Sequence, residues 1–224
     1  GSDVFSAILY GMRISLAVGV AGVIFAGALG IALGLIAGYF GGAVDSVILR
    51  IADVQLTFPA FLIALLGHGV ATSILGNRLD ATSMLVVLVI SIGLSFWVGY
   101  ARTVRGSVMV EKNKDYVAAA QLIGLPAPKI MLRHVLPNAM GPILVIATIN
   151  LALAIITEAT LSFLGVGIPP TQPSLGTLIR IGDDFLFSGE WWITIFPGVP
   201  LALLALAVNL LGDWLRDALN PKLR

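Results

Sequence analysis

Three polar side chains, Ser95, Asn150 and Glu158, lie within or at the end of long apolar stretches of the chain. Hydroxyl, amide and carboxyl groups in such positions can hydrogen-bond a polar solute or a neighbouring helix, and a carboxylate can also bind a cation. One interpretation is that all three line a substrate pathway. The alternatives are hydrogen bonds between helices and, for Glu158, a hydrated position or an ion pair with Arg180.

No catalytic motif accompanies these residues. The chain has no cysteine, and it lacks a Gly-x4-Gly-Lys-Ser/Thr phosphate loop, a His-Glu-x2-His zinc motif and a nucleophile placed with a supporting base. We therefore expect no enzymatic activity, no metal and no cofactor in this chain. If the protein transports a solute against a gradient, the energy must come from an ion or from a separate ATPase.

A polar, basic segment from Arg102 to Pro137 interrupts the apolar pattern. Asp115 begins an alanine-rich stretch suited to a short helix, and Gly124 suits the position just after its end. Pro126 or Pro128 suits the start of a second short helix. This pattern predicts a compact docking surface, with a plain helical hairpin loop as the alternative.

Long apolar helices must position these residues. Of the 224 residues, 58% are hydrophobic and 11% charged, with a mean hydropathy of +1.01, whereas soluble domains have about 25% charged residues. A helix of about 20 apolar residues crosses the hydrocarbon core of a bilayer. The sequence predicts one all-α, polytopic membrane domain over 1–224, with a loop at 102–137 and spans at about 14–40, 54–72, 82–101, 138–161 and 191–212.

Three local patterns refine this prediction. Gly30, Gly34 and Gly38 recur at four-residue spacing, which favours close approach of another helix. Pro59 predicts a kink in the second span or its first turn. Residues 3–13 are predicted to form a separate short amphipathic helix at the membrane surface.

The distribution of positive charge predicts the orientation. Six Lys/Arg lie in 102–134 and three in the C-terminal tail, whereas 166–190 contains one. The positive-inside rule places 102–134 and the C-terminus in the cytoplasm, and 166–190 and the N-terminus outside. His68 and His134 then lie on opposite sides and are not expected to share a metal. Because the chain starts outside and without methionine, we expect a further span upstream.

The motifs of the basic segment resemble the EAA loop of ABC importer permeases. Ala118-Ala119-Ala120, three residues, Gly124, nine residues and then His134-Val135-Leu136-Pro137 follow that pattern, with Ala118 in place of its glutamate. Further motifs resemble the dipeptide, oligopeptide and nickel branch, and its C-type permease in particular. These are Tyr39-Phe40-Gly41-Gly42, Arg50 with Asp53, Phe58-Pro59, Asp115-Tyr116, Leu161-Ser162-Phe163-Leu164-Gly165, Pro169-Pro170 and the tail from Asn209 to Pro221.

This resemblance implies a type I importer transmembrane domain in the bacterial inner membrane. Its implied partners are a homologous permease subunit, two cytoplasmic ATPase subunits that bind ATP and Mg, an extracytoplasmic solute-binding protein and membrane lipid, with no nucleic acid. The loop would be a coupling element seated on an ATPase. Its implied contact residues are Asp115, Tyr116, Ala118, Ala119, Ala120, Gly124, Arg133, His134, Leu136 and Pro137.

The cargo implied by the resemblance is a dipeptide, a longer peptide, a nickel chelate or a related small solute. The alternative function is an ion-coupled secondary transporter, which needs ionisable residues near the membrane midplane; Glu158 alone fits that requirement, and only loosely. A membrane-embedded hydrolase would need a nucleophile–base pair, which the sequence does not contain.

Overall fold

The chain is helical along almost its whole length. The computed structural model describes residues 4–76, 80–167 and 172–218, and these contain helices and no strand. The Pro169-Pro170 motif and the tail residues Pro221, Lys222 and Arg224 lie outside the described residues. The predicted all-α fold is confirmed.

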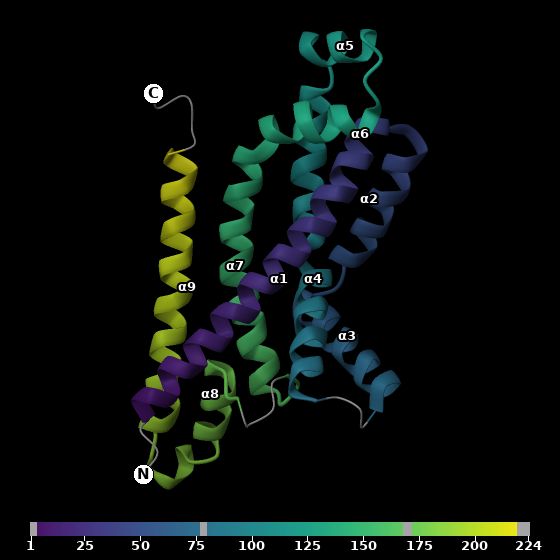
Figure 1. Ribbon diagram of the computed structural model, residues 1–224. Coiled ribbons are helices and arrows are strands. Elements are labelled where there is room, and N and C mark those ends of the chain that lie inside the picture. The colour runs from purple at the N-terminus through teal and green to yellow at the C-terminus, as the bar shows by residue number, and fades with distance from the viewer. Residues whose placement is uncertain (1–3, 77–79, 168–171, 219–224) are drawn as a thin grey trace.

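The long helices of the described chain lie along the length of the molecule, although two of them each cover only part of it (Figure 1). They are α1 (Val4–Phe40), α2 (Gly42–Leu56), α3 (Ala60–Leu75), α4 (Ala81–Glu111), α7 (Met140–Phe163) and α9 (Trp192–Ala218). The short elements lie near the ends: α5 (Asp115–Leu122), α6 (Ala127–Ile130), a π-helical turn (Met131–Val135), a 3₁₀ turn (Leu136–Ala139), α8 (Leu175–Asp183) and a second 3₁₀ turn (Leu186–Ser188).

The second apolar stretch is broken in its middle. Four helical stretches of the described chain are long and apolar enough to cross a membrane, and α2 with α3 makes a fifth if that pair, bent by 96°, counts as one span. Pro59 directly precedes α3, at Ala60. Because proline has no backbone N–H and disfavours a helical conformation in the residue before it, the chain bends there, as the sequence predicted.

Helix α1 is continuous from Val4, so the prediction of a separate helix over 3–13 is wrong. Gly11, near the end of the expected short helix, does not interrupt α1. A Cβ on Gly11 would lie 3.2 Å from the backbone nitrogen of Leu175, at the start of α8. The glycine therefore serves close packing of α1 against α8.

The glycine row on α1 packs against α4, which confirms the predicted close approach. A Cβ on Gly30 would lie 2.4 Å from the Trp97 carbonyl oxygen, and one on Gly34 would lie 2.6 Å from that of Ala101. Gly38 meets a side chain of α4 in the same way. Helices α1 and α4 thus form a tight pair. The segment that begins with α5 follows directly after α4.

Candidate functional site

Helices α5 and α6 form a hairpin, and α5 projects beyond the ends of the long helices (Figure 1). Gly124 ends α5 with a φ of 78°, a left-handed conformation that suits glycine. The backbone N–H of Gly124 donates to Gln121 O at 3.0 Å, and that of Leu125 donates to Ala120 O at 3.1 Å. These bonds satisfy the last carbonyl groups of α5 and turn the chain towards α6.

Apolar side chains attach this hairpin to the rest of the molecule. Val117 of α5, Ile130 of α6 and Val135 of the π-helical turn are almost fully buried. They belong to one core cluster with Val104 and Val108 of α4. One face of the hairpin is therefore part of the protein core.

Polar contacts centred on Glu111 join the same elements. Its carboxylate accepts hydrogen bonds from Lys114 Nζ at 2.7 Å and from the Tyr116 hydroxyl at 2.5 Å. Asn138, just before α7, donates from Nδ2 to the Tyr116 hydroxyl at 3.2 Å and to His134 O at 2.7 Å. The network links the end of α4, the start of α5 and the approach to α7.

The protonation state of Tyr116 fits this network. Burial, together with hydrogen bonding to Glu111, raises the pKa of the Tyr116 phenol to about 12. The phenol therefore keeps its proton at neutral pH and donates it to the carboxylate, a charge-assisted bond that is stronger than one between neutral groups.

Helix α4 is in turn tied to α1 and α2 near the hairpin. Arg105 Nη2 lies 2.6 Å from Asp45 Oδ2 of α2. Lys112 Nζ donates to Gly38 O of α1 at 2.8 Å. The hairpin is therefore attached to a group of three helices, α1, α2 and α4, which are held together by packing and by contacts of charged side chains.

The residues expected to form a docking surface separate into two groups. Seven are exposed: Asp115, Tyr116, Ala118, Ala119, Gly124, Arg133 and Pro137. The other three, Ala120, His134 and Leu136, are buried or half-buried, and the backbone oxygen of His134 accepts a hydrogen bond from Asn138. Tyr116 is exposed and also bonds to Glu111, so it contributes both to the surface and to its support.

The sequence motifs do not single out two residues at the end of α5 that projects from the molecule. Leu122 and Ile123 are 88% and 76% exposed. Their signal in the sequence is a pair of apolar residues directly before the glycine that ends the helix. Adjacent exposed apolar side chains on a projecting, well-anchored element favour contact with another protein.

The three polar residues expected to line a pathway do not lie together. Ser95 and Asn150 line one cavity of about 220 Å³, together with Gln55. Glu158 is not among the residues that line it. It lies further along α7 than Asn150, by roughly 12 Å at 1.5 Å per residue.

Glu158 belongs to a buried polar cluster between α1, α7 and α8. Its side chain is fully buried and accepts a hydrogen bond from Ser162 Oγ at 2.7 Å. Ser15 of α1 and Ser174, which caps α8, also approach the carboxyl group. Within the described chain it forms no ion pair with Arg180, and its full burial separates it from bulk water.

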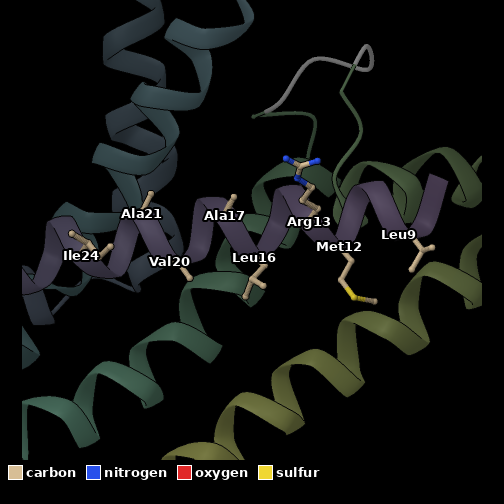
Figure 2. Close-up of a pocket in the computed structure, with 8 residues that line it drawn as sticks. All are labelled: Leu9, Met12, Arg13, Leu16, Ala17, Val20, Ala21 and Ile24. Atoms are coloured by element: carbon tan, nitrogen blue, oxygen red, sulfur yellow. The ribbon is translucent and has the colours of Figure 1, made fainter. Parts of the chain in front are cut away.

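A larger hollow of about 680 Å³ lies along α1. All of its lining residues belong to this one helix, so it is an open face of α1. Figure 2 shows Met12 and Leu16 pointing to one side of the helix and Arg13 to the other. Because the lining is almost entirely apolar, this face suits lipid or another helix.

Comparison with known proteins gives consistent matches. Residues 30–224 match the family described as binding-protein-dependent transport system inner membrane component. The chain is 41% identical over 224 residues to the dipeptide transport system permease protein DppC of Haemophilus influenzae, over 100% of this chain and 72% of that protein. It is 39% identical over 225 residues to the glutathione transport system permease protein GsiD of Pectobacterium atrosepticum, over 100% of this chain and 71% of that protein.

Solved structures share the fold at low sequence identity. A chain of the MetNI methionine ABC transporter, in an inward-facing conformation, matches with a TM-score of 0.72 and 18% identity over 98% of this chain and 99% of that chain. An amino acid ABC transporter chain matches with a TM-score of 0.65 and 16% identity over 97% and 99%. The match over most of the sequence, with these relatives, shows that the chain belongs to the family of inner membrane components of binding-protein-dependent transport systems.

Proposed function

We propose that this chain is the permease subunit of an ATP-driven importer that carries peptides across a bacterial inner membrane. Family membership and relatives named as dipeptide and di/tripeptide permeases support this over an ion-coupled secondary transporter. The subunit would act with a homologous permease, two ATPases that bind ATP and Mg, and an extracytoplasmic solute-binding protein. It performs no chemical step itself.

The proposed orientation puts the α5 end of the molecule in the cytoplasm. The end of α9 lies at the same end of the molecule as α5, and α8 lies at the other (Figure 1). Lys112, Lys114, Lys129 and Arg133 lie in or beside the hairpin, whereas 166–190 at the other end contains only Arg180, and the positive-inside rule assigns the more basic end to the cytoplasm. The C-terminus is cytoplasmic in this arrangement, and α8 faces the binding protein.

The observation that carries the proposal is the exposed apolar end of α5 on a firmly attached hairpin. Leu122 and Ile123 would insert into a surface of the ATPase, with Ala118 and Ala119 allowing close approach along the helix. Arg133 adds a positive charge that favours an acidic rim. Movement of the ATPase would then displace the hairpin, and with it the attached ends of α4 and α7.

The test is co-purification of the ATPases with the complete transporter. Leu122→Asp should strongly reduce the amount of bound ATPase, because a carboxylate would be buried without a partner. Leu122→Met should retain it, since the substitution keeps the apolar surface. Phe187→Asp is the matched control at the opposite end of the molecule, because Phe187 is also fully exposed (relative exposure 102%).

Equal retention of ATPase by Leu122→Asp and Leu122→Met would refute the docking role of α5. A second measurement addresses energy coupling. Liposomes containing the assembled transporter should import peptide with ATP and loaded binding protein in the absence of any ion gradient. Uptake that requires an ion gradient and proceeds without ATPase would instead establish the secondary transporter.

A further inference from the structure

Helix α2 is attached to the rest of the molecule by little apolar packing. Ala52 is its one buried residue, and its other residues are exposed or half-buried. Ala52 belongs to a small core cluster with Trp97 and Ala101 of α4. Because burial of apolar surface is the main source of packing energy, the position of α2 depends strongly on its polar contacts.

Polar contacts join α2 to α4 near both ends of α2. Near its start, Arg105 donates from Nε and Nη2 to the two carboxylate oxygens of Asp45, with Nη2 2.6 Å from Oδ2. Near its end, Gln55 Nε2 donates to Leu94 O at 2.6 Å, and Gln55 Oε1 accepts from Trp97 Nε1 at 2.7 Å. All three partner residues belong to α4, so these contacts align α2 along that helix.

The two ion pairs between these helices differ in geometry and in burial. The side chains of Arg105 and Asp45 are 26% and 16% exposed, and two nitrogens contact two oxygens. The side chains of Arg102 and Asp53 are 47% and 61% exposed, and one nitrogen contacts one oxygen. Bidentate pairs are the stronger kind, and exposed pairs contribute little. The pair of Arg105 with Asp45 is therefore the stronger attachment of α2.

This attachment lies between the hairpin and the bend. Lys112 directly follows α4, donates from Nζ to Gly38 O of α1 at 2.8 Å, and its charge also attracts Asp45. The start of α2 is thus held beside the segment that leads into α5. Helix α2 ends shortly before Pro59, where the chain bends by 96°. Figure 1 shows α2 running from the hairpin end of the molecule to this bend, about halfway along it.

We propose that Asp45 and Arg105 are positioning residues for coupled transport. Their ion pair fastens α2 to α4, so that a displacement of the hairpin carries α2 along with α4 and shifts the bend at Pro59. Without the pair, α4 would still follow the hairpin, but α2 would follow it less closely. The ATPases would then hydrolyse ATP with less import of peptide. This inference rests on the proposed function as a peptide importer.

The experiment compares Asp45→Asn with Asp53→Asn, a matched control on the same helix, in the complete transporter. It measures amide exchange in α2 and the number of labelled alanyl-alanine molecules imported per ATP hydrolysed. Asp45→Asn should quicken exchange in α2 about tenfold, as expected for loss of a hydrogen bond between charged groups. It should also lower import per ATP severalfold while the ATPases stay bound. Asp53→Asn should change neither quantity, because the pair it breaks is exposed.

A double variant tests whether the two residues act through each other. Arg105→Gln should reproduce the effects of Asp45→Asn, and the two changes together should be no worse than either alone, because the same interaction is lost each time. Unchanged exchange, unchanged import per ATP, additive losses in the double variant or equal effects of Asp53→Asn would each overturn the proposal. Uptake by the unsubstituted transporter separates the two ideas: without it the proposed function fails, and with it these results decide the role of the pair alone.

Discussion

Gly30→Ala should strongly destabilise the pairing of α1 with α4. The added Cβ would lie 2.4 Å from the Trp97 carbonyl oxygen and 2.5 Å from Tyr100 Cβ. Ordinary contact begins near 3.4 Å, so the helices would have to separate by about 1 Å at this point. Neither obstacle can move by a rotamer change, because both atoms are fixed to the α4 backbone. We expect a loss of about 3 kcal/mol, the upper part of the range for overpacking.

The assay is reversible unfolding of the purified protein in mixed micelles with increasing denaturing detergent. Gly106→Ala is the control on α4, because no described atom beyond the neighbouring residues and backbone of the same helix lies within 4 Å of the Cβ position at Gly106. That change should be neutral or stabilise by up to about 1 kcal/mol through helix propensity. If the two variants unfold at the same detergent fraction, tight packing of the glycine row does not hold α1 against α4.

Two further predictions concern the polar networks. Tyr116→Phe removes the hydroxyl that donates to Glu111 and should weaken attachment of α5 by about 1–2 kcal/mol. Relative to the unsubstituted protein, amide exchange should become faster in α5 and stay the same in α9. Unchanged exchange in α5 would contradict this. Glu158→Ala leaves Ser162 without its buried acceptor and should destabilise the fold by about 1–3 kcal/mol, whereas Glu158→Gln should lose less. Transport per assembled complex should stay unchanged in Glu158→Gln; a selective loss of transport would return Glu158 to the pathway.

The sequence predicted the helical fold well because apolar length is a local property. The sequence was less informative about the second span. The stretch without charged residues predicted that this span begins near residue 54. Helix α2 instead starts at Gly42 and includes Asp45 and Asp53. These carboxylates pair with arginines of α4. Such pairs join residues far apart in the chain, so composition alone does not reveal them.

The candidate docking segment shows a similar limit. Motif spacing located the hairpin and its glycine, but it did not separate the residues that face the core from those that face outwards. Ala119 and Ala120 are neighbours in the same motif, yet the first is exposed and the second is buried. Leu122 and Ile123 resemble core residues by type, and only the projection of α5 shows that they are exposed.

The hairpin and the cavity share two helices, which gives the proposed mechanism a physical route. Helix α4 carries Glu111 at the hairpin and Ser95 at the cavity, and Asn138 and Asn150 lie before and within α7. Asn138 and Asn150 are separated by roughly 18 Å along the chain direction. A displacement of the hairpin would therefore move two walls of the cavity, while the α3 N-terminus across the bend belongs to a different element. Movement of the ATPase would therefore change the shape of this cavity through α4 and α7.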